Sequence, residues 1–285
     1  NADTGLTVLV GQMPEDTYEG LLVGDDNMVQ DNGLLVIQAR NRFGDMRLDS
    51  GLYGVADGRQ VGRPLHLGVG LLGVRGTFGD VAYHGHGLAQ FGRWKNAGLN
   101  GDNVSIRAYA LSAGVRRKAK VSRFHYGANA FAVSGDDTHH GNDTLGAFFS
   151  SAKNHSPTRY LTEDEDRDRY DNLDERLGSI WGPFFYNRAG LAIVDAFVGW
   201  AVMDVDMTVV LGHGMVLVPD NIMGHRHVGT EATLQSQLML APGARVFCAL
   251  TGFLPQDAAA VRVNDVDRAA KDPVMAAQAG LHLSF

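Results

Sequence analysis

Several histidines in this sequence stand at a spacing that could bind a metal ion. Residues i and i+2 of an extended strand point to the same side, so such a pair can present two imidazoles to one ion. Zinc sites usually have three or four protein ligands, and no cysteine or carboxylate stands at motif spacing here. We therefore expect hydrogen-bonded histidines and no metal site at His84 and His86, at His225 and His227, and at the adjacent His139 and His140.

Two polar segments could carry other chemistry. The acidic run from Glu163 to Asp174 offers carboxylates that could bind calcium, but arginines interleave with it and the spacing of an EF-hand loop is missing. A solvated loop is the better interpretation of this run. The segment from Ser134 to Asp137, Ser-Gly-Asp-Asp, is typical of a turn at the end of a strand.

The sequence contains none of three common catalytic signatures. A nucleophile elbow Gly-x-Ser-x-Gly, a glycine-rich phosphate loop and a His-Glu-x-x-His pair are all absent. His282 and Ser284 resemble the His-x-Ser element of barrel phospholipases. Both fall on the polar side of the last predicted strand, which in a barrel would face the lumen rather than the lipid, so we discount this resemblance. We expect no enzymatic activity and no cofactor.

Composition narrows the class of protein. The formal net charge of −7 argues against a nucleic-acid partner, whose binding proteins are usually basic. The single cysteine, Cys248, excludes an intrachain disulfide framework. Glycine is unusually common, with 36 among 285 residues, which is typical of tight turns and closely packed strands. No segment reaches the roughly 18 uncharged apolar residues of a transmembrane helix.

Hydrophobic residues recur with period two along most of the chain. Met203, Val205 and Met207 fall on one side of an extended segment, and Asp204 and Asp206 fall on the other. About twelve such segments, and up to fourteen, run for some 10–14 residues, and a tilted strand needs about 9–11 to cross a bilayer. The pattern predicts an all-β protein, a transmembrane antiparallel up-and-down barrel of roughly 12–14 strands or more with long extracellular loops.

We expect one domain over residues 1–285, because no linker or change of composition divides the chain. A long loop is predicted at about residues 135–186, and a shorter one at residues 255–273.

The last strand carries a candidate assembly signal. Phe285, Leu283 and Leu281 alternate with polar residues at the C-terminus, and a terminal aromatic residue in such a strand resembles the assembly signal of bacterial outer-membrane barrels. The last strand of a barrel must pair with the first to remove the exposed edges. An ordinary amphipathic strand of a soluble protein would show the same alternation, so this reading stays open.

Six short segments stand in this order along the chain: AYALSAG (108–114), YGANAF (126–131), SGDD (134–137), GAFF (146–149), RHVGTE (226–231) and FLP (253–255). Taken together, they resemble the alginate-export family of outer-membrane porins. The resemblance covers roughly residues 104–255 and implies a monomeric antiparallel barrel with short periplasmic turns, which conducts an anionic polysaccharide through an arginine-lined lumen. The chain is short for the larger strand count of that family, and residues 1–60 lack its opening motifs.

The polar sides of the strands supply candidate selectivity residues. A channel selects by the charge and width of its lumen. Cations outnumber acids on these sides although the whole chain is acidic, because the excess acid lies mainly in loops. The same alternation places apolar Leu65, Leu67, Ile106 and Ala108 toward lipid. The candidate lumen residues are Arg40, Arg42, Arg47, Arg107, Arg123, Arg245, Asp204, Asp206 and Glu231.

The sequence thus favours a channel in the bacterial outer membrane that passes anionic solutes or an anionic polysaccharide. Its expected partners are the lipid bilayer, the outer-membrane assembly machinery and, in the periplasm, envelope proteins. Two alternatives remain: a structural barrel, acting as a sleeve or anchor with its lumen occupied by a loop or a partner, and a soluble β-protein or barrel enzyme.

Overall fold

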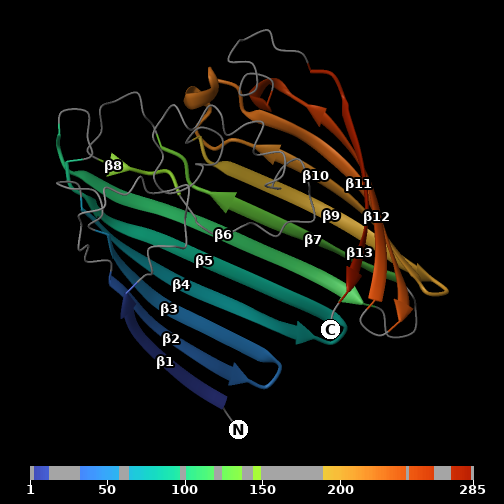
Figure 1. Ribbon diagram of the computed structural model, residues 1–285, viewed down its shortest axis with the longest axis horizontal. Coiled ribbons are helices and arrows are strands. Elements are labelled where there is room, and N and C mark those ends of the chain that lie inside the picture. The colour runs from blue at the N-terminus through green and yellow to red at the C-terminus, as the bar shows by residue number, and fades with distance from the viewer. Residues whose placement is uncertain are drawn as a thin grey trace.

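The computed structural model describes residues 3–12, 33–57, 64–96, 101–118, 124–136, 144–148, 189–241, 244–259 and 271–283. Within these ranges the chain forms one antiparallel sheet in which each strand pairs with the next along the sequence (Figure 1). The two-residue strand β8 stands outside this order and pairs in parallel with β6. The all-β, up-and-down architecture predicted from the sequence is therefore confirmed.

The strands are long, as a membrane-spanning sheet requires. They are β1 (Asp3–Gln12), β2 (Gly33–Phe43), β3 (Met46–Asp57), β4 (Leu65–Phe78), β5 (Val81–Trp94), β6 (Val104–Lys118), β7 (Phe124–Val133), β8 (Thr144–Leu145), β9 (Leu191–Val202), β10 (Val205–Met215), β11 (His227–Ala241), β12 (Ala244–Pro255) and β13 (Val274–Leu283). One 3-10 helix, η5 (Pro219–Ile222), follows β10. No helix in the described ranges has the length and apolar character needed to cross a membrane.

Two-residue turns set the register of the first hairpins. Gly44 and Gly79 each open such a turn with positive φ angles of 59° and 64°, which glycine adopts without a steric cost. Phe43 therefore pairs with Met46, and Phe78 pairs with Val81. These turns lie at one end of the sheet, here called the short-turn end, and the longer connections lie at the opposite, long-loop end.

The sheet is strongly curved, with β1 at one edge and β13 at the other (Figure 1). Within the described ranges no backbone pairing joins these two strands. Curvature gives the sheet a convex and a concave face, and alternation assigns every side chain to one of them.

The convex face is apolar over most of its extent, with polar side chains such as Arg93 and Arg107 near the long-loop end. Large hydrophobic side chains stay exposed there, among them Val10 at 77% and Leu111 at 52%. A soluble monomer rarely exposes an apolar surface of this extent, whereas a lipid-facing sheet requires one. Members of this face from successive strands include Leu6, Val8, Leu35, Ile37, Leu52, Leu72, Phe91, Tyr109, Val115, Tyr126, Val194, Val198, Leu211, Leu234, Leu250, Met275 and Leu281.

The concave face is partly filled at the long-loop end, and this overturns one expectation. Leu65, Leu67, Ile106 and Ala108 were predicted to face lipid, yet they are buried on the concave side. The reason is that segments between strands fold inward and supply apolar partners. Leu145 and Ala147 pack on β4 and β6. A second cluster joins β6, β9 and β12 through Ala108, Ile193, Val216, Ile222, Phe253 and Ala258.

The Ser-Gly-Asp segment after β7 anchors this inward packing. The Ser134 hydroxyl accepts from the Tyr109 backbone N–H at 2.8 Å and donates to the Gly146 carbonyl at 2.7 Å. The Asp136 carboxylate accepts from the Gly146 N–H at 2.8 Å. A Cβ at Gly135 would lie 2.4 Å from the Ala189 carbonyl oxygen, so only glycine allows this approach. The predicted turn thus holds the segment around Gly146 in place through hydrogen bonds. Most of the predicted long loop lies outside the described ranges.

Replacing Leu234 with arginine is expected to destabilise the folded sheet far more than the same change at its neighbour Gln235. Leu234 is on the convex face and Gln235 on the concave face. A lipid-facing arginine near the bilayer midplane costs roughly 2–4 kcal/mol, and a lumen-facing one costs little. Unfolding by denaturant in lipid vesicles measures the difference, and equal losses would show that the faces are misassigned.

Candidate functional site: a basic cluster on the concave face

Strand register brings four arginines together near the short-turn end. Arg42 on β2 pairs with Arg47 on β3, Arg47 pairs with Arg75 on β4, and Arg75 pairs with His84 on β5. Like charges directly opposite each other destabilise a sheet. Three guanidiniums side by side therefore need either a compensating acid or an anionic ligand.

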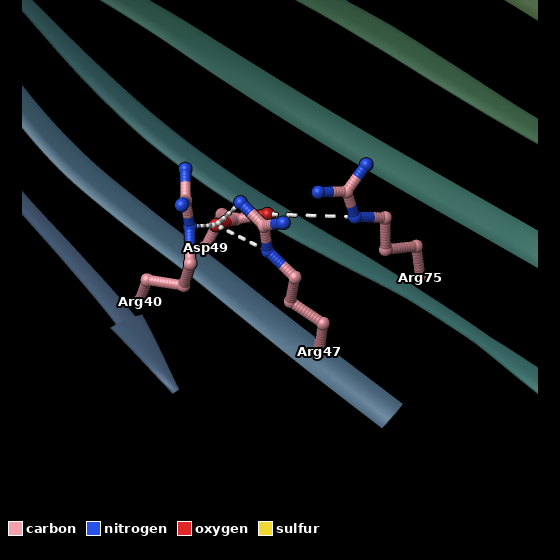
Figure 2. Close-up of polar contacts among 4 residues, drawn as sticks. All are labelled: Arg40, Arg47, Asp49 and Arg75. Atoms are coloured by element: carbon pink, nitrogen blue, oxygen red, sulfur yellow. Dashed lines mark hydrogen bonds and ion pairs between the residues drawn. The ribbon is translucent and has the colours of Figure 1, made fainter. Parts of the chain in front are cut away.

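The compensating acid is Asp49, which lies among these arginines (Figure 2). Its Oδ1 accepts from Arg40 Nε at 3.1 Å and from Arg47 Nε at 3.0 Å. Arg75 Nε lies 3.9 Å from its other oxygen, Oδ2. Figure 2 shows the carboxylate of Asp49 between the guanidiniums of Arg40 and Arg75.

The cluster keeps an excess of positive charge. We define the basic cluster as Arg40, Arg42, Arg47, Asp49 and Arg75. Its carboxylate contacts three of the four guanidiniums, and that of Arg42 donates to the Gly44 carbonyl instead. The side chains of Arg40 and Arg75 are 55% and 51% exposed, whereas that of Asp49 is 14% exposed. An open cavity of about 710 Å³ is lined by all four arginines. Their fork-shaped donors suit carboxylate or phosphate oxygens.

Acids occupy the other half of the concave face. Asp195 on β9 is buried and accepts from Asn129 Nδ2 at 2.8 Å. Glu231 on β11 is 1% exposed and accepts from the Thr233 hydroxyl at 2.9 Å. Asp206 lies on the same side nearer the short turns, opposite Gln237. The four arginines of the basic cluster thus lie on β2–β4, and these three acids lie on β9–β11. Arg245 on β12 also faces the concave side, so the separation of charge is partial.

The structure places the predicted lumen residues unequally. Arg40, Arg42, Arg47, Arg245, Asp206 and Glu231 all lie on the concave side, as the alternation predicts. Their role in selectivity stays a prediction. Arg123 and Phe285 lie outside the described residues. Leu281 faces outward on β13, and the backbone of Leu283 pairs with Ala244.

Two assignments need correction. Arg107 lies on the convex face beside Tyr109 and Leu111, because the apolar side of β6 turns inward to meet the folded-in segments. Asp204 belongs to the tight turn between β9 and β10 rather than to a strand face, since Val202 already pairs with Val205.

Arg75 was missed by the sequence analysis. It shares a side with Leu65 and Leu67, which alternation alone assigned to lipid. The turn at Gly79 and Asp80 could have revealed on which side of the sheet Arg75 lies. Counting back from that turn pairs Arg75 with His84, which alternates with apolar residues such as Tyr83 and so lies on the polar side of its strand.

No protein-family model and no curated protein matches the sequence. Three solved structures are similar to the chain at a low level: a NanC porin, the outer membrane channel DcaP of Acinetobacter baumannii, and OccK11 (OpdR) of Pseudomonas aeruginosa. Sequence identities are 8%, 9% and 11%, with TM-scores of 0.39, 0.39 and 0.40. The matches cover 89%, 90% and 100% of this chain and 94%, 92% and 78% of those chains.

Asp49→Asn is expected to lower the free energy of unfolding by roughly 1 kcal/mol, a value typical of a partly exposed charge network. The substitution leaves the neighbouring guanidiniums without their carboxylate. Denaturant unfolding in vesicles at low salt measures the loss, and high salt should reduce it. Asp45→Asn, in the adjacent turn, is the control, and an equal effect of both changes would contradict a special role for Asp49.

Proposed function

We propose that this protein is an outer-membrane channel that passes anionic solutes. The observation that carries the proposal is the division of the sheet into an apolar convex face and a concave face that bears the basic cluster. Such a division is the reverse of a soluble fold, and it suits a sheet with lipid on one side and water on the other.

Anion preference follows from the composition of the basic cluster. Arginine stays charged at any working pH, and its planar donors bind carboxylate or phosphate oxygens in pairs. A wall of excess positive charge in a confined space raises the local concentration of anions. The resemblance to the alginate-export family adds a finer proposal, that the solute is an anionic polysaccharide.

We propose that the protein acts as a conduit for solutes, that it is not an enzyme and that it uses no cofactor. Its partners would be the lipid bilayer, the outer-membrane assembly machinery and its solute, and not nucleic acid. The net charge of −7 fits the expectation that nucleic acid is not a partner.

One observation favours a second candidate function. Segments at the long-loop end fold inward and pack against β6, β9 and β12. A barrel closed in this way could serve as a structural sleeve or anchor in an envelope assembly. A purified protein that inserts into planar bilayers without conducting would favour that role.

Replacing Arg42 and Arg75 with glutamate is expected to shift the reversal potential of the channel from anion preference toward cation preference. Each change reverses a charge that lines the basic cavity. The measurement is single-channel conductance across a salt gradient, at low ionic strength where screening is weak.

Arg107→Glu is the matched control for this experiment. The side chain of Arg107 lies on the convex face and should leave the reversal potential unchanged in any protein that inserts. A wild-type channel that already prefers cations would overturn the proposal.

Deleting Phe285 is expected to impair insertion into the outer membrane, because the terminal aromatic residue is the predicted assembly signal. Heat-modifiable gel mobility and protease sensitivity of the periplasmic precursor measure the defect. Ser284→Ala, a small change next to it, should insert normally. Normal membrane yield after the deletion would argue against an assembly signal in this strand.

A further inference from the structure

Two histidines from neighbouring strands meet on the convex face near the long-loop end, where that face also carries the polar side chains of Arg93 and Arg107. His213 is close to the end of β10, and His227 is the first residue of β11. The Nε2 atom of His213 lies 3.2 Å from Nδ1 of His227, and their ring centroids are 5.4 Å apart. A register shift at Gly214 and Met215 brings these rings together.

The spacing of the two nitrogens matches the bite of a metal ion. Zinc binds imidazole nitrogen at about 2.0–2.1 Å in tetrahedral geometry, which puts two ligand nitrogens about 3.3 Å apart. Thr230 adds the second feature of such a site. Its hydroxyl oxygen lies 3.0 Å from Nδ1 of His213. With Nδ1–H donating to that oxygen, the Nε2 lone pair of His213 is directed outward, an orientation that metal-binding histidines usually receive from an oxygen partner.

We propose that His213 Nε2 and His227 Nδ1 form a two-histidine site for a divalent transition-metal ion such as Zn²⁺, with water at the remaining positions. Among the described residues no three His, Cys, Asp or Glu side chains converge to make a closed site. The site is therefore open, and its ion can exchange with solution. It is separate from the basic cluster, which lies near the opposite, short-turn end.

The neighbouring histidine, His225, has a different partner. The Asp257 carboxylate lies 4.0 Å from His225 Nδ1 and pairs with Lys271. His225 is thus directed to Asp257, and the histidine spacing noticed in the sequence, His225 with His227, is not the pair that meets. The two histidines that meet, His213 and His227, come from the neighbouring strands β10 and β11.

Binding requires only a change of tautomer. In the ion-free pair, Nδ1–H of His227 donates to Nε2 of His213. When the ion binds, that proton leaves Nδ1 and Nε2 of His227 takes one up, so both rings stay neutral and no net proton is released.

Titration of the untagged, detergent-solubilised protein with Zn²⁺ by calorimetry near neutral pH tests the site. We expect one Zn²⁺ per chain at this site, lost in both His213→Ala and His227→Ala. Thr230→Val, which removes the orienting hydroxyl, should weaken binding by roughly 10–100-fold. His66→Ala is the matched control, because His66 is an exposed strand histidine on another part of the sheet, and it should bind as the wild type does.

A spectroscopic readout keeps the test independent of folding defects. Cu²⁺ bound to the wild type should show electron paramagnetic resonance coupling to two imidazole nitrogens, and His227→Gln should reduce it to one. Wild-type protein that binds no Zn²⁺, or binding that survives in both alanine variants, would overturn the proposal. Loss of binding in His66→Ala would also overturn it, since the ion would then sit elsewhere.

Discussion

The backbone ladder of the antiparallel sheet is the constraint on which every other feature depends. Side chains alternate with period two, so a slip of one residue between two strands would exchange their faces completely. Short turns limit such slips in the first hairpins, because Gly44 and Gly79 take a left-handed conformation that fixes which residues pair. The apolar convex surface and the charged concave surface are both consequences of that register.

The same constraint explains why charge accumulates where it does. Pairing across β2, β3 and β4 places Arg42, Arg47 and Arg75 in one row, and the sheet cannot separate them without losing its backbone hydrogen bonds. Asp49, one alternation step away, offsets part of the repulsion. The positive charge that Asp49 does not neutralise is set by the strand register, and it can attract a mobile anion. The buried acids on β9 and β11 lie far along the sheet and are held by Asn129 and Thr233.

Sequence periodicity predicted the strands, the short turns and the faces of β2, β3, β5 and β11, because in those strands polar and apolar residues separate cleanly. It failed in β4 and β6 for one physical reason. A lumen that receives folded-in segments needs an apolar wall of its own, so Leu67 and Ile106 face inward while Arg107 faces outward. Alternation shows that two faces differ, but which one meets lipid depends on contacts between residues far apart in sequence. The His213–His227 contact escaped notice for a related reason, since it arises from a bulge between strands.

The concave face therefore has two different ends, and this bears on how the proposed channel would work. At the long-loop end, Ser134 and Asp136 hold a segment inward and the wall becomes apolar. At the short-turn end the wall is basic and open. An anion that enters the proposed channel from the short-turn end would meet the basic wall first and the apolar wall second, whereas one from the other side would meet them in reverse order. The hydrogen bonds of Ser134 and Asp136, which hold the apolar segment inward, would then shape the path of the solute together with the arginines.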